Sequence, residues 1–220
     1  NIYVTGYYNG SHATFLNTDG TTGAKLDVSV GTDVFVAKYN PSGFVQWATR
    51  MGDTAITTVV GIDISYGIAV DLDSNIIVTG LYQANNLTIF NAPNGSVASG
   101  ISLGNTNPVT TDAFIVKYSA SGSAIWATRI GGVSYEYGMS LAVDRQNNII
   151  VGGGYESEPV TIYNTPNGTV SALQLVNDGG VDAFIVKYNQ NGVALWGTRI
   201  TGTNGEIIES VATDCDSNIL

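Results

Sequence analysis

One segment occurs three times in this 220-residue chain, at residues 33–50, 112–129 and 182–199. Its third copy reads DAFIVKYNQNGVALWGTR. All three tryptophans of the chain, and six of its eight lysine and arginine residues, lie in these copies. Each copy places two short apolar runs on either side of a turn that ends in glycine, which predicts a β-hairpin. A hairpin that recurs in this way indicates a repeat protein built from β-sheet.

The hairpin also predicts cross-strand pairs. If the two ends of the turn 40–43 face each other, Asp33 faces Arg50 and Val36 faces Trp47, and a glycine bulge would shift these pairs by one residue. The acid, the tryptophan and the arginine recur in every copy, as packing requires, whereas a catalytic site needs only one copy. We therefore interpret them as structural locks, with all three tryptophans buried between sheets. The locks are Asp33, Trp47, Arg50, Asp112, Trp126, Arg129, Asp182, Trp196 and Arg199.

Self-similarity extends over the whole chain. The repeat units are residues 1–74, 75–147 and 148–217, and residues 218–220 begin a fourth copy. A period this long, with strand signals and no capped helical pattern, predicts an all-β fold, namely a β-propeller of four-stranded antiparallel blades. We expect a single domain over residues 1–220. Because three blades cannot close a ring, we expect either an arc of a larger ring or half of a six-bladed dimer.

Four strands can be placed in each unit. The innermost is predicted at residues 66–71, 139–144 and 209–214, because these segments are small and apolar. An Asn-Ile strand follows, and then a long insertion that precedes the recurrent hairpin. Within the insertion, a short apolar run and a turn predict a small extra hairpin that decorates each blade.

These residues resemble a known family. The segments DAFIVKYNQNGVALWGTRI and YGIAVDLDSNIIVTGLY closely resemble the bacterial-type β-propeller repeats abbreviated SBBP. The resemblance covers the whole chain three times, although the insertions are longer than in that family and residues 207–210 replace its Tyr-Gly. It implies a propeller that is often surface-exposed or secreted. It implies no catalytic residues, because the repeated motif encodes packing.

Composition excludes several classes of partner. The formal net charge is −10 and no cluster of Lys or Arg occurs, which argues against nucleic acid and anionic membranes. No apolar run of about 18 residues is present, so no membrane span is expected. The single cysteine, Cys215, excludes an intrachain disulfide. Since the chain opens in mid-pattern and without Met, we expect it to be part of something longer.

Two acidic sets are candidate cation sites. The first resembles the opening of a calcium loop, but it lacks the glycine and the bidentate glutamate of such loops, so a tight turn between strands is the favoured interpretation. The second falls just before each innermost strand and is expected to ring the mouth of a central channel, where it could bind a cation or a basic partner; solvated loop charges are the favoured alternative. The first set is Asp71, Asp73, Asn75, Asp214, Asp216 and Asn218. The second is Asp63, Glu136 and Glu206.

Three functions remain open. The first is a non-enzymatic scaffold that binds protein partners, or the remaining blades of the same polypeptide, at a cell, matrix or virion surface, with a homodimer as an alternative assembly. The second is a lectin-like, ligand-binding propeller that uses Tyr7, Tyr8, Tyr82 and Tyr155 as stacking platforms. The third is an enzyme with an acidic site at the channel mouth. We expect no enzyme and no cofactor other than calcium, because His12 is the only histidine and no acid or nucleophile accompanies it.

Overall fold

The computed structural model describes residues 1–220 except 28, 30, 55–60, 84 and 106. Every regular element among the described residues is a β-strand. The strands, in chain order, are β1 (Ile2–Asn9), β2 (Ala13–Leu16), β3 (Thr22–Leu26), β4 (Thr32–Tyr39), β5 (Val45–Gly52), β6 (Ile64–Val70), β7 (Ile76–Tyr82), β8 (Asn86–Asn91), β9 (Val97–Gly104), β10 (Asp112–Tyr118), β11 (Ala124–Gly131), β12 (Glu136–Val143), β13 (Ile149–Tyr155), β14 (Val160–Asn164), β15 (Val170–Leu175), β16 (Asp182–Tyr188) and β17 (Ala194–Ile200).

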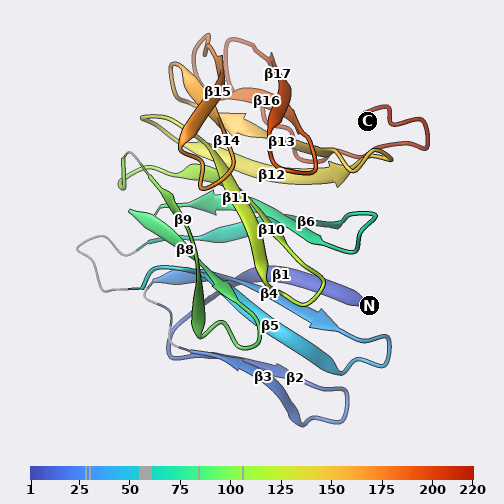
Figure 1. Ribbon diagram of the computed structural model, residues 1–220. Coiled ribbons are helices and arrows are strands. Elements are labelled where there is room, and N and C mark those ends of the chain that lie inside the picture. Colours follow the sequence, from blue (N-terminus) through green and yellow to red (C-terminus); the bar gives the residue numbers. More distant parts are fainter. Residues whose placement is uncertain (28, 30, 55–60, 84, 106) are drawn as a thin grey trace.

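Three antiparallel sheets, stacked face to face, form the body of the protein (Figure 1). We call their meanders blades. Blade 2 runs β6-β7-β10-β11 and blade 3 runs β12-β13-β16-β17, which confirms four-stranded antiparallel blades. Blade 1 is β1-β4-β5, and in the described residues no strand pairs with the inner edge of β1. The inner strands β1, β6 and β12 pack in succession, so they lie on one common side of the stack.

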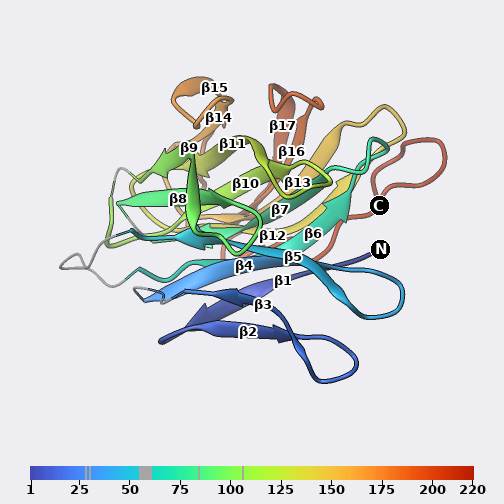
Figure 2. The same ribbon diagram turned by 60° about the horizontal axis from the view of Figure 1, so that its bottom comes forward.

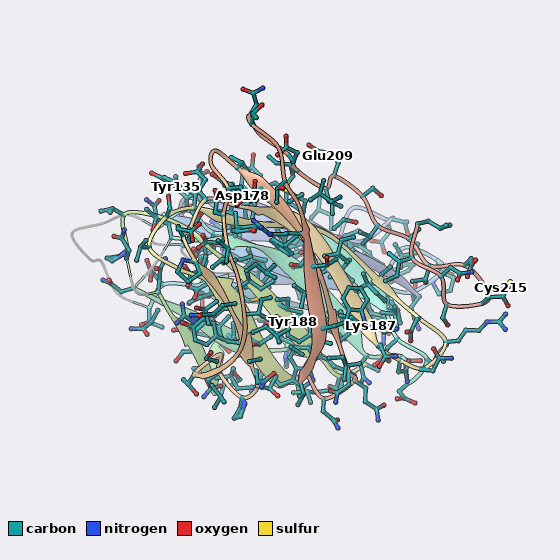
Figure 3. The ribbon with its side chains drawn as sticks, turned by 90° about the horizontal axis from the view of Figure 1, so that it is seen from above. Tyr135, Asp178, Lys187, Tyr188, Glu209 and Cys215 are labelled. Atoms are coloured by element: carbon teal, nitrogen blue, oxygen red, sulfur yellow. The ribbon has the colours of Figure 1, made fainter. Side chains whose placement is uncertain are left out.

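The predicted innermost strand forms in two of its three copies, as β6 and β12. Residues 209–214 do not form a β-strand, so that prediction was wrong. This segment instead lies along β12, where the Val211 amide donates to Ser140 Oγ (3.1 Å) and Thr213 Oγ1 donates to the Val143 carbonyl (3.0 Å). In the described residues its pairing with the next Asn-Ile segment is a single bridge, between Thr213 and Ile219, in place of the ladder that β6 and β12 form with β7 and β13. The neighbouring Cys215 lies on a loop that extends away from blade 3 (Figure 3).

The recurrent hairpin forms in all three blades, but its register differs from the predicted one. Phe35 pairs with Arg50, and Lys38 pairs with Trp47. The turn closes between Asn40 and Phe44 rather than between Asn40 and Gly43, and a bulge at residues 38–39 adds a second residue of shift. The predicted direct pair of Asp33 with Arg50 is therefore wrong, and the two residues are diagonal neighbours. The same bulge recurs in the other two copies.

The extra hairpin in each insertion does more than decorate its own blade. Strand β8 of the second unit pairs with β5, so the hairpin β8–β9 extends blade 1 to the order β1-β4-β5-β8-β9. Strand β14 of the third unit pairs with β11 and extends blade 2 in the same way. The corresponding hairpin of the first unit, β2–β3, stands as a separate two-stranded sheet beside blade 1 (Figure 2). Each paired hairpin therefore joins two successive repeats.

The apolar core lies between blades. One cluster fills the space between blades 1 and 2 and includes Val36, Trp47 and Phe114. The second cluster lies between blades 2 and 3 and includes Trp126 and Phe184. Because strands buried on both faces carry apolar residues at successive positions, β7, β10 and β13 show no polar face.

Candidate functional site

The repeated acid and arginine form a buried ion pair inside blades 1 and 2. Arg50 Nη1 donates to Asp33 Oδ2 at 2.7 Å, and Arg129 makes the same contact with Asp112. Gly52 stands opposite Asp33, and a Cβ there would collide with the carboxylate. Gly52 and Gly131 directly follow Arg50-Met51 and Arg129-Ile130. Their missing side chains leave the space through which each aspartate reaches its diagonal arginine.

Each of these arginines also stacks on an aromatic ring from the next repeat. The guanidinium carbon of Arg50 lies 3.9 Å from the ring centre of Phe90, and that of Arg129 lies 4.0 Å from the ring of Tyr163. In blade 3 no such ring is supplied by the described residues. There Arg199 turns to the exposed Asp178 (3.0 Å) and lies 3.5 Å from Asp182.

The repeated lysine and tryptophan bind the following blade. Lys38 Nζ and Trp47 Nε1 both donate to the carbonyl of Ala120, at 2.9 and 3.2 Å, in the turn of the second hairpin. In blade 2, Lys117 and Trp126 donate in the same manner to the carbonyl of Gln190. The lock is thus a contact between blades as well as within one.

Trp196 does not follow this pattern. It is 39% exposed, whereas Trp47 and Trp126 are 7% and 5% exposed. The prediction that all three tryptophans are buried was therefore wrong for the third copy. The physical reason is that the first two indoles are covered by the hairpin turn of the following repeat, and no described residue takes that place over Trp196.

The calcium-like turns are occupied by side chains of the protein itself. Asp71 Oδ2 accepts from Lys117 Nζ at 2.8 Å and from the amide of the Asn75 side chain at 3.0 Å, while Oδ1 accepts two backbone amides. These contacts hold the Asp71 pKa below its usual value against the opposing effect of burial. Asp144 has the same arrangement with Lys187. Asp73 meets the amide of Asn147 in the neighbouring blade, so this turn links blades too.

The exposed copy of this turn carries the same internal contacts. Asp214 accepts from the side chain and the backbone amide of Asn218 and from the Asp216 amide, which lowers its pKa. No three His, Cys, Asp or Glu side chains among the described residues are gathered as ligands for a metal ion.

The acids expected around a channel mouth are not a solvated ring. Asp63 and Glu136 are 1% and 0% exposed, while Glu206 is half-buried. Asp63 Oδ1 accepts from the Gln83 amide, and Glu136 Oε1 accepts from the Ser157 amide, both at 3.2 Å. Asp63 and Glu136 therefore lie at the same end of the blades as the insertions, because Gln83 and Ser157 stand at the starts of two insertions. The interpretation as solvated loop charges fails for Asp63 and Glu136, because the start of each insertion covers them.

Burial dominates the electrostatics of the carboxyl groups at this end of the blades. It raises the pKa of Glu136 to about 8, although the hydrogen bond from Ser157 acts in the opposite direction. It also raises the pKa of Asp33 to about 7 and that of Asp112 to about 6, although the paired arginine lowers each of them. Glu136 Oε2 and the Oδ1 atoms of Asp33 and Asp112 accept no hydrogen bond from the described residues. Each group therefore loses hydration that its partners replace only in part.

The tyrosines expected to stack on a ligand are mostly inside the protein. Tyr82 and Tyr155 are fully buried, and their hydroxyls donate to the carbonyls of Gly104 and Val176. They cannot be stacking platforms, so that part of the lectin-like hypothesis was wrong. Tyr8 donates to the Asp27 carbonyl on its own unit's insertion. Only Tyr7, at 58% exposure, is open to solvent among the four residues.

The sequence reasoning missed a row of three tyrosines on the inner strands and a fourth, Tyr135, directly before β12. Tyr7 of β1 and Tyr66 of β6 lie close enough for Tyr7 to raise the pKa of Tyr66, after the larger effect of burial. The pKa of Tyr137, on β12, is raised to about 12 by burial, with smaller contributions that include Tyr135 and Tyr66. We call these four residues the tyrosine row. These tyrosines stand at different positions of successive repeat units. Aligning the units position by position therefore does not reveal them.

The described residues enclose no pocket of ligand size. They contain no helix that is long and apolar enough to cross a membrane.

Comparison with known proteins gives one relevant relative. No family model matches the chain. Over its whole length the chain is 38% identical to a protein of Acanthamoeba polyphaga mimivirus whose name is uncharacterized WD repeat-containing protein. The chain spans 18% of the length of that relative. Sheets stacked as blades, and similarity to a protein with propeller-type repeats, agree with the predicted all-β repeat fold of the propeller kind.

Proposed function

We propose that this chain is an arc of a β-propeller that acts as a non-enzymatic scaffold and binds protein partners. The observation that carries the proposal is the use of the repeated polar residues. The Asp-Arg pairs, the Lys-Trp contacts and the Asp71-type turns in the described blades are engaged in holding strands and blades together. The repeated chemistry is thus structural, and binding falls to the surface that differs between units.

The tyrosine row is the surface that fits a protein partner. Tyrosine combines a large apolar ring with a polar hydroxyl and loses little side-chain freedom, which is why it is enriched at interfaces. Tyr7, Tyr66 and Tyr135 are 58%, 45% and 39% exposed. Tyr7 and Tyr66 lie on the inner strands β1 and β6, and Tyr135 directly precedes β12, so the three lie on the side of the stack that faces the axis when blades form a ring. We place the scaffold at a cell, matrix or virion surface, the setting that the resemblance to SBBP repeats implies.

The test is affinity capture from the source material, with the unaltered chain compared with a Tyr66→Ser/Tyr137→Ser variant. A Val97→Ser variant is the matched control, because Val97 is 63% exposed and lies on an inserted hairpin, away from the row. We expect the same partner to be retained by the unaltered and control chains and lost by the double variant. Equal capture by all three chains would reject the tyrosine row, and a partner that is a glycan rather than a protein would favour the ligand-binding alternative.

A further inference from the structure

On the outer edge of blade 3, residues 196–200 are more exposed than their counterparts in blades 1 and 2. Thr198 is exposed, whereas Thr128 of blade 2 is fully buried. Ile200 is 51% exposed, whereas Ile130 is 0% exposed. The Arg199 side chain is 31% exposed, against 8% and 11% in the other two copies. The amino-acid sequence of this edge nevertheless resembles those of the covered edges of blades 1 and 2.

Blades 1 and 2 show what covers such an edge. Ile130 pairs with Ile162 of the inserted hairpin that follows, and Met51 pairs with Ile89 in the same register. The threonine hydroxyl two residues earlier donates to a backbone carbonyl of that hairpin: Thr128 Oγ1 donates to Tyr163 O and Thr49 Oγ1 to Phe90 O, both at 2.7 Å.

The residue whose carbonyl accepts this hydrogen bond makes a second contact through its side chain. Phe90 and Tyr163 each place their ring on the arginine between the threonine and the apolar residue. Next in sequence, Asn91 and Asn164 accept a backbone amide from the hairpin of their own unit, from Ala124 and Ala194. The strand that covers an edge thus reads Thr-Ile-aromatic-Asn, and each of its last three positions has a stated contact.

We propose that the free edge of β17 is a docking site for an inserted hairpin of a further repeat, whose first strand reads Thr-Ile-aromatic-Asn. In the docked register the isoleucine pairs with Ile200, its neighbour's carbonyl accepts from Thr198, and the aromatic ring lies on Arg199. Main-chain pairing at a sheet edge supplies the affinity, and the ring supplies the specificity. The proposal concerns the assembly of repeats and does not depend on the tyrosine row.

A second copy of this chain fits the edge less well. Its only unpaired hairpin is β2–β3, in the described residues, and the corresponding strand reads Thr14-Phe15-Leu16-Asn17. Leu16 stands where the ring belongs, so Arg199 would lose the cation–π contact that Arg50 and Arg129 both make. The edge therefore favours a hairpin of the β8–β9 or β14–β15 kind.

The probe is a peptide of residues 85–105, closed by a disulfide between cysteines added at its two ends. Asn86 and Gly104 are cross-strand partners, so the closure keeps the hairpin paired, which an isolated hairpin would not do reliably in water. Binding is measured by isothermal calorimetry, with the peptide titrated into the full chain.

We expect saturable binding. A peptide with Phe90→Ala should bind about tenfold more weakly, because the contact of the ring with the guanidinium is lost. In an Arg199→Gln chain, shown by circular dichroism to be folded, the two peptides should bind equally. Absence of binding at millimolar peptide, or equal binding of both peptides to the unaltered chain, would overturn the proposal.

One further measurement separates a second copy from a further repeat. Light scattering of the chain alone, over a range of concentrations, should show no dimer. If such a dimer forms and Leu16→Asp dissolves it, the occupant is the β2–β3 hairpin of a second copy and the proposal is wrong.

Discussion

Replacing Trp126 with alanine should be far more destabilising than the same change at Trp196. Trp126 is 5% exposed, and its indole Nε1 donates to the Gln190 carbonyl of the next blade at 3.2 Å. Burying a tryptophan removes roughly 200 Å² from water, and truncation of such a residue in a core costs about 3–5 kcal/mol. The lost hydrogen bond adds about 1 kcal/mol, because the carbonyl is left in the cavity. We therefore expect a loss near the upper end of that range.

Trp196 is the matched control, because it occupies the same place in the same hairpin. It is 39% exposed, and no described residue accepts a hydrogen bond from its indole. Water can fill the space that the truncated side chain leaves, so the cavity contribution is small and we expect a cost of about 1–2 kcal/mol.

Urea unfolding of the unaltered chain and both variants, followed by far-UV circular dichroism, measures the difference. The midpoint should fall much further for Trp126→Ala than for Trp196→Ala, with slopes that are unchanged. Equal costs at the two positions would refute the reasoning, because they would mean that the following blade adds nothing to the stability of the hairpin it covers.

Three other changes test the buried carboxyl groups and the turns. The folded Glu136 pKa is raised to about 8, so the stability that its protonated form contributes is fully present below the unfolded pKa near 4.5 and is lost as pH rises through 8. Glu136→Gln should therefore flatten the fall of the melting temperature between pH 5 and 8. An unchanged profile would contradict the assignment. Gly131→Ala should destabilise by about 1–3 kcal/mol, because its Cβ would meet the Asp112 carboxylate, whereas Gly104→Ala, whose nearest atom is 3.7 Å away, should be tolerated in the same urea assay. Millimolar calcium should leave the melting temperature unchanged, because Asp71 is already neutralised by a lysine, and a clear rise would restore the calcium hypothesis.

The sequence by itself determined the blades and most of their strands. Periodic apolar runs around a glycine-ended turn specify a hairpin locally, and repetition of the hairpin requires equivalent units. The roles of Asp33, Trp47 and Arg50 as structural residues followed from the same repetition, and the ion pair and the indole contact are present in blades 1 and 2. The exact pairs did not follow, because a one-residue change of turn closure and a bulge alter every pair while leaving the alternation of faces intact.

Only the tertiary structure decided which sheet each inserted hairpin joins. The run around Ile89 has the same apolar pattern whether it pairs with its own blade or with β5, so no local signal specifies the partner. Burial of Glu136 was equally beyond the sequence. A glutamate beside a loop is usually solvated, and this one is buried because the start of the next insertion, at Ser157, folds over it. Both features depend on contacts between residues far apart in the chain, whereas periodicity and turn chemistry report only on neighbours.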